Sequence, residues 1–176
     1  MLRFVGLVTS LLLVLACFSV AQEPKAEIFG GYQYTRIDTG ISGVDGINLN
    51  GWNASLSGYF TKHFGISADF SGAYGSPFGV STKVHTFMFG PIVHFPNSSK
   101  ITPFAHVLFG GAHGSASAGG FGGGDTDFAW AAGGGLDANL NHRFAVRMAQ
   151  FDFLQSRFGG DSQNNFRYSA GIVLKF

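Results

Sequence analysis

The last eleven residues, FRYSAGIVLKF (166–176), alternate between two kinds of side chain and decide the fold class. Counted back from the C-terminal residue in steps of two, every side chain on one face is apolar or aromatic. The opposite face is mixed and carries Arg167 and Lys175. A period of two residues is typical of a β-strand. The sequence therefore predicts a strand whose apolar face must lie against a large apolar surface.

Residues 1–21 have the features of a secretory signal peptide. A basic residue precedes an apolar core over about 4–16, and two small residues fit cleavage before Gln22. The core is shorter than the roughly 20 residues that a membrane-spanning helix needs. The stretch around Cys17, VLAC, leaves an alternative open, which is cleavage and acylation as a bacterial lipoprotein. We predict a signal peptide, and therefore an exported protein.

The mature domain over 22–176 is unusual in composition. Charged residues make up 12% of the whole chain, about half of the roughly 25% found in soluble domains, which indicates that much of the outside does not face water. The net charge is +1 and no lysine or arginine cluster is present, which excludes nucleic acid as an expected partner. No apolar run after residue 21 approaches the length of a spanning helix. A membrane location would therefore require a closed barrel, in which every backbone group is paired.

Alternation recurs along the domain and predicts eight strands, each long enough to cross a bilayer when tilted. In the fifth strand we expect His106 to point inward. In the seventh, Arg147 and Asp152 have opposite parity, so that either a β-bulge separates them or one lies near a strand end. The predicted strands are 27–38, 49–62, 66–74, 82–95, 101–113, 128–140, 144–156 and 166–176.

The predicted connections alternate in length. Short turns are expected at 62–65, 96–100 and 141–143, and longer loops at 39–47, 75–82, 113–127 and 157–165. We interpret GGFGGG in the third long loop as a flexible surface segment, because no helix follows it to complete a phosphate site. Short periplasmic turns and long external loops are typical of an all-β, eight-stranded antiparallel up-and-down transmembrane β-barrel. A soluble lipocalin-like barrel, with its apolar faces inside, is the alternative.

The chain resembles the OmpA/OmpX-type eight-stranded outer-membrane β-barrel family in its short form, without a periplasmic peptidoglycan-binding domain. The resemblance covers residues 26 to 176 and implies a location in the bacterial outer membrane, with outer-membrane lipid and the insertion machinery as partners. It also implies that the terminal aromatic strand is the assembly signal, carried by Tyr168, Ile172, Leu174 and Phe176. The stretches that carry the resemblance are EIFGGYQYTRI, GWNASLSGYFTKHFGISADFSGAYG, FMFGPIVHF, TPFAHVLFGGAHG, FAVRMAQFDFL and YSAGIVLKF.

An eight-stranded barrel is just wide enough for its own side chains to fill it, so we expect no large pore. Polar side chains on the inward faces should be paired with one another, since an unpaired buried charge is costly. The predicted interior polar network comprises Gln33, Asn53, Ser55, Ser57, Tyr59, Asp69, Asp137, Asn139, Arg147, Asp152, Arg167 and Lys175.

The sequence contains no strong catalytic or metal-binding motif. The six histidines have no pair at helical metal spacing, and no Gly-x-Ser-x-Gly elbow is present. We therefore predict no cofactor, no metal and no catalytic residue. The leading hypothesis is a structural protein of the envelope. The alternatives are a surface interaction protein that acts through its long loops, and a narrow channel or lipid-acting enzyme.

Overall fold

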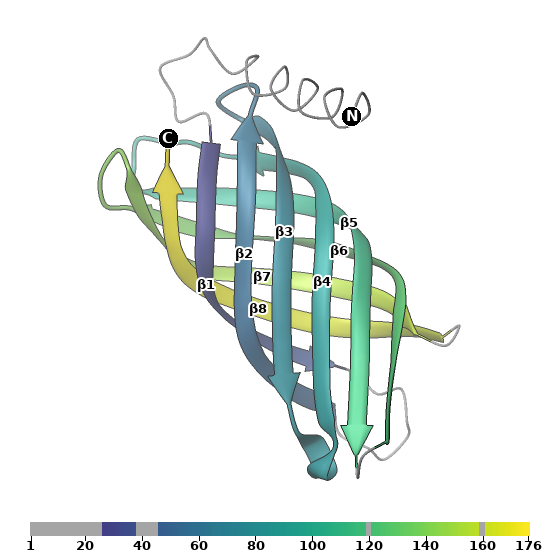
Figure 1. Cartoon of the computed structure of the whole chain (residues 1–176). Coiled ribbons are helices and arrows are strands. Elements are labelled where there is room, and N and C mark those ends of the chain that lie inside the picture. The colour runs from purple at the N-terminus through teal and green to yellow at the C-terminus, as the bar shows by residue number, and fades with distance from the viewer. Residues whose placement is uncertain (1–25, 38–45, 119–120, 159–160) are drawn as a thin grey trace, which may run out of the picture.

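Eight antiparallel strands close into a barrel, each paired with its neighbours in chain order (Figure 1). The computed structural model describes residues 26–37, 46–118, 121–158 and 161–176. The predicted signal peptide and Cys17 lie outside these residues. The strands are β1 (Ala26–Ile37), β2 (Ile47–Tyr59), β3 (Phe64–Gly75), β4 (Ser81–His94), β5 (Ile101–Ala118), β6 (Phe121–Asn139), β7 (Phe144–Phe158) and β8 (Asp161–Lys175), with a short 3-10 helix, η1 (Pro77–Gly79), between β3 and β4.

The first and last strands complete the closure. β1 pairs with β2 on one side and with β8 on the other, in a register that places Glu27 opposite Lys175. The pairing continues to the last residue, where the backbone N–H of Phe176 donates to the carbonyl of Ala26 at 2.9 Å. Every strand of the ring is paired with a neighbour on each side, so the ladder satisfies backbone groups that lipid could not. The predicted up-and-down barrel is confirmed.

The outer surface of the barrel is apolar. Large side chains project outward from every part of the ring, including Leu56 (54% exposed), Phe89 (57%) and Ile172 (58%). This arrangement contradicts the lipocalin-like alternative, which needs the apolar faces inside. In the described part of the chain, no helix has the length and apolarity to span a membrane.

The interior is mixed rather than purely polar. Buried polar and charged side chains share the lumen with two apolar groups. The smaller group is formed by Phe29, Ala145 and Val173. The larger one comprises Met88, Leu108, Ala112, Ala129, Ala131 and Leu154. The polar network therefore occupies only part of the lumen, and apolar packing fills the rest.

The described residues of two predicted long loops, 113–127 and 157–165, lie in strands instead. Residues 113–118 and 121–127 continue the β5–β6 ladder, in which Ser115 pairs with Gly124 and Ala118 with Phe121. The described residues of GGFGGG therefore lie in β6, and the prediction of a loop there was wrong. Similarly, residues 161–165 belong to β8. Glycine has a low strand propensity. Here the register is imposed by the rest of the β5–β6 ladder and by β4, which pairs with β5 as far as Ser117.

These extensions make the barrel tall on one side. In Figure 1 the β3–β4 and β5–β6 hairpins reach furthest from the end that holds the C-terminus. The short connections, 60–63, 95–100 and 140–143, lie between the strand ends at the C-terminal end. We call this the turn end of the barrel.

A β-bulge in β7 resolves the conflict of parity between Arg147 and Asp152. The register shifts between Arg147 and Gln150, so Met148 and Ala149 lie between two buried residues. One extra residue on the outer face reverses the alternation. Both charged side chains consequently point into the lumen, as the bulge hypothesis requires.

Deleting Met148 should be tolerated, because its removal leaves a regular strand in which Arg147, Gln150 and Asp152 keep their inward facing. Deleting Ala54 from β2, which has no bulge, should instead reverse the facing of the side chains in one half of that strand, so that polar residues face lipid and apolar residues face the lumen. We expect the heat-resistant folded band on a gel without boiling to be comparable to wild type for the Met148 deletion and lost for the Ala54 deletion. Equal loss in both would contradict this account of the bulge.

Candidate functional site

A single arginine joins the two sides of the lumen. Arg167 on β8 is completely buried; its Nη1 donates to Oδ1 of Asp69 on β3 at 2.7 Å, and its Nε donates to Oδ2 of Asp152 on β7 at 2.8 Å. β3 and β8 are not neighbours in the sheet, so this contact crosses the interior. The amide of Asn53 donates to the second oxygen of Asp69 at 2.8 Å. All three charges are thus paired, as burial requires.

Asp152 extends this ion pair into a longer chain. Its Oδ1 lies 2.7 Å from Nε2 of His106, and its Oδ2 accepts a hydrogen bond from the amide of Gln150 at 2.8 Å. Gln150 in turn accepts from Nη1 of Arg147 at 2.8 Å. Arg147 then donates to both oxygens of Asp137, at 2.8 and 3.0 Å. A continuous network therefore links six strands, since these residues lie on β5, β6 and β7, and Arg167 on β8 joins them to Asp69 on β3 and Asn53 on β2.

Apolar side chains and one glycine hold the network in position. The guanidinium of Arg147 lies between the rings of Phe29 and Phe104, 4.5 and 4.0 Å from their centres, within the range of cation–π contacts. At Gly133 a Cβ would collide with Oδ1 of Asp152. Glycine at this position therefore leaves the space that the carboxylate occupies.

The network separates the two ends of the lumen. The cavity that Arg167 borders has a volume of only about 20 Å³, room for roughly one water molecule. A second cavity of about 410 Å³ opens at the turn end. The two share no lining residue, so they are separate cavities within the described residues.

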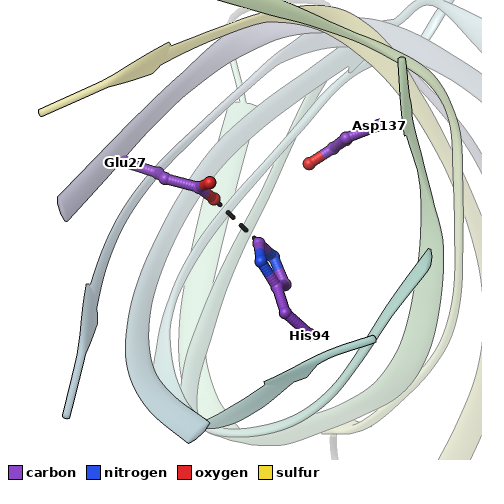
Figure 2. Close-up of side chains that lie close together, drawn as sticks. All are labelled: Glu27, His94 and Asp137. Atoms are coloured by element: carbon purple, nitrogen blue, oxygen red, sulfur yellow. Dashed lines mark ion pairs between the residues drawn. The ribbon is translucent and has the colours of Figure 1, made fainter. Parts of the chain in front are cut away.

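Three potential metal ligands point toward one another near the turn end. Figure 2 shows Glu27, His94 and Asp137 approaching from three sides of the barrel wall, and their ligand atoms all lie within 4.8 Å of one another. Histidine and carboxylates are common metal ligands. This juxtaposition is invisible in the sequence, because the three residues lie on β1, β4 and β6.

The protein's own cations already neutralise both carboxylates of this group. Asp137 accepts two hydrogen bonds from Arg147, and Nζ of Lys175 lies 3.3 Å from Glu27. Glu27 also accepts a hydrogen bond from the hydroxyl of Tyr59 at 2.9 Å. A metal ion here would have to displace an ammonium or guanidinium group, so the geometry favours an internal ion-pair cluster.

The twelve residues of the predicted polar network all face the lumen or its turn end. Nine are buried, and Tyr59, Asn139 and Lys175 are half-buried. Not all of them meet. Gln33 donates to Thr35 and Ser57 to Ser67, apart from the charged chain. Lys175 and Asn139 join at 2.7 Å in a separate group at the turn end.

Several interior residues were missing from the prediction. Glu27, His94 and Gln150 are buried and bonded to network members. Strand parity could have identified two of them, because Glu27 shares the parity of Gln33 and Gln150 that of Asp152. The expectation that His106 points inward agrees with its burial.

The residues assigned to the assembly signal lie on the outer face of β8 or just beyond it. Ile172 and Phe176 are exposed, while Tyr168 and Leu174 are half-buried. The hydroxyl of Tyr168 donates to the carbonyl of Met148 at 3.2 Å. These side chains face the lipid side of the barrel, and their role in assembly remains a prediction.

Replacing Arg167 by methionine should leave Asp69 and Asp152 buried without their shared partner. Breaking a buried ion pair in this way costs about 3–5 kcal/mol, so we expect the free energy of unfolding to fall by that order in denaturant titrations of the folded protein in detergent. The triple variant R167M/D69N/D152N should recover part of the loss, because it removes the charges together. The control R143M removes an exposed arginine from a turn. A loss no larger in R167M than in R143M would contradict this role.

Comparison with known proteins gives a family and a fold. The model of the outer membrane protein beta-barrel domain family matches residues 9–176. No curated protein sequence matches the chain. Among solved structures, Neisserial surface protein A is similar with a TM-score of 0.73 and 13% identity, covering 86% of this chain and 97% of that one.

Two further structures have the same fold. The attachment invasion locus protein Ail of Yersinia pestis has a TM-score of 0.66 and 19% identity, covering 88% of this chain and 100% of its own. The N-terminal barrel domain of Pseudomonas aeruginosa OprF has a TM-score of 0.56 and 15% identity, covering 88% and 98%. The match to the family model over nearly the whole chain shows that this protein belongs to the outer membrane protein β-barrel domain family.

Proposed function

We propose that this protein is a structural component of the bacterial outer membrane, which spans the bilayer as a closed barrel and contributes to the integrity of the envelope. The observation that carries the proposal is the bridge that Arg167 forms across the lumen between Asp69 and Asp152. A solute-conducting barrel needs a passage, whereas this interior is bonded across its width. A structural role needs only a stable ring and an apolar outside, and the chain has both.

The outer surface supports the membrane part of the proposal. Outward-facing aromatic side chains lie at both ends of the barrel wall, such as Phe64 and Phe144 toward the turn end and Trp52 and Tyr74 toward the other. The indole N–H of Trp52 donates to the hydroxyl of Tyr74 at 3.2 Å, so this polar group has a hydrogen-bond partner on the outer surface. Aromatic residues of this kind occupy the two lipid–water interfaces of membrane barrels.

Deleting Phe176 should reduce assembly of the barrel. In this proposal residues 1–21 direct export and the insertion machinery reads the outward face of the last strand. We expect the outer membrane of a two-membrane bacterium to contain a heat-modifiable band for the wild-type chain and much less of it for the Phe176 deletion. The substitution Phe176→Tyr, which keeps an aromatic end, is the matched control. A soluble periplasmic product from the wild-type chain would contradict the membrane assignment.

A second candidate function rests on the tall β5–β6 hairpin. These strands have 18 and 19 residues, whereas a tilted strand needs about 9–11 to cross a bilayer, so the hairpin provides a surface beyond the membrane. One of the similar structures is named an attachment invasion locus protein. A surface interaction through this hairpin is therefore the alternative to a purely structural role. Neither function assigns a catalytic residue to this chain.

Loss of the protein should raise the sensitivity of the native cells to SDS and to large antibiotics that an intact outer membrane excludes. A variant in which Asn-Gly replaces residues 114–125 joins β5 to β6 by a tight turn and should restore resistance as fully as wild type does. Normal resistance in cells without the protein would contradict the structural proposal. If only the shortened variant failed to restore a cell-attachment phenotype, the hairpin would carry the function.

A further inference from the structure

The cavity at the turn end is lined by an unequal set of charges. It measures about 410 Å³, within the roughly 300–1,000 Å³ typical of small-molecule pockets. Lys62, Lys100 and Lys175 line it together with a single carboxylate, Glu27, which gives a net charge of +2 (three minus one) with the histidines neutral. A concave wall with this excess attracts anions.

The positive groups come from separate parts of the fold. Lys62 lies in the turn between β2 and β3, Lys100 in the connection between β4 and β5, and Lys175 at the end of β8. His142, from the turn between β6 and β7, also lines the cavity. Each short turn of the barrel therefore contributes one basic side chain to the same rim. The strands that carry these turns belong to a closed sheet, so the positions of the turns are fixed relative to one another.

The excess charge is concentrated at the mouth of the cavity. In the floor, Lys175 is held by Glu27 at 3.3 Å and by Asn139 at 2.7 Å, and its charge is compensated. Lys62 and Lys100 are exposed and form no ion pair with any residue in the described ranges. Two ammonium groups therefore border the opening without a partner of opposite charge.

Several other lining residues carry groups that can donate hydrogen bonds to oxygen atoms. Amide groups are provided by Asn97, Asn139 and Asn141, and hydroxyl groups by Thr61 and Thr102. A phosphomonoester group carries about −1.5 to −2 charges at neutral pH and has three acceptor oxygens. The two positive charges of the unpaired ammonium groups match the charge of such a group better than they match the single charge of a carboxylate. The amide and hydroxyl groups can donate hydrogen bonds to the remaining oxygens.

We propose that this cavity binds a phosphate group, presented either by a small soluble phosphomonoester or by the headgroup of a neighbouring lipid. The ammonium groups of Lys62 and Lys100 bind the phosphate oxygens at the mouth. The amide and hydroxyl groups contact the organic part of the ligand. The cavity volume leaves room for a group about the size of glycerol beyond the phosphate.

The test uses the folded full-length barrel in a neutral, phosphate-free detergent. Titration calorimetry with inorganic phosphate and with glycerol 3-phosphate should show saturable binding that weakens as salt is added. The double variant K62Q/K100Q loses both charge-assisted hydrogen bonds at the mouth, so it should bind at least about tenfold more weakly. The matched control K83Q removes an exposed lysine from β4, outside the cavity lining, and should bind like wild type. For each variant, a heat-resistant folded band on a gel without boiling shows that the barrel is folded.

Two further arms distinguish the sources of the phosphate. If a lipid headgroup is the ligand, barrels in phosphatidylglycerol vesicles should no longer bind added glycerol 3-phosphate, while barrels in detergent still do. If a soluble phosphomonoester is the ligand, binding should be the same in both. Absence of phosphate binding by the wild-type barrel in detergent would overturn the proposal, as would equal binding by K62Q/K100Q and wild type.

Discussion

The pairing of β1 with β8 is the constraint on which the rest of the structure depends. A row of unpaired backbone groups in lipid costs several kcal/mol per group, and this pairing leaves no such row. Closure also fixes which side chains share the lumen, because each strand is locked in register with two neighbours. Residues as distant as Asp69 and Arg167 meet only because the ring is complete.

Each charged side chain buried inside the ring needs a partner of opposite charge. Arg167 donates hydrogen bonds to the carboxylates of Asp69 and Asp152, and His106 is a further partner of Asp152. Arg147 takes both oxygens of Asp137 and is flanked by two aromatic rings. Moving any one member would leave another buried polar or charged group without its partner, which is costly. The turn end differs, since Lys62 and Lys100 there line an open cavity and form no ion pair within the described residues, whereas Lys175 is paired with Glu27.

The alternation of side chains was sufficient to predict the fold, because one face of each strand meets lipid and the other does not. It also identified the buried aspartates and arginines of the lumen but missed about half of the buried polar residues. The opposite parities of Arg147 and Asp152 indicated either a bulge or a strand end, and the structure contains the bulge. The lengths of the hairpins were not predictable in this way. Glycine and serine have weak strand propensity, and those in 113–118 and 121–127 are held in extended strands by pairing within the β5–β6 ladder and, as far as Ser117, with β4. The meeting of Glu27, His94 and Asp137 depends on the stagger of the closed sheet, which one sequence does not encode in any local pattern.

The reach of Arg167 across the barrel also bears on how the chain acquires its structure. Its bond to Asp69 joins residues 98 positions apart, and the β1–β8 seam joins the two ends of the domain, so the most distant contacts are also the ones that complete the ring. Contacts between distant residues form slowly, because the entropy of the intervening loop is lost before they contribute stability. A chain interrupted before β8 would therefore lose far more than one strand in eight. It would have two open edges, on β1 and on β7, and two buried aspartates without their arginine, so partial products would be candidates for degradation or aggregation rather than smaller working barrels.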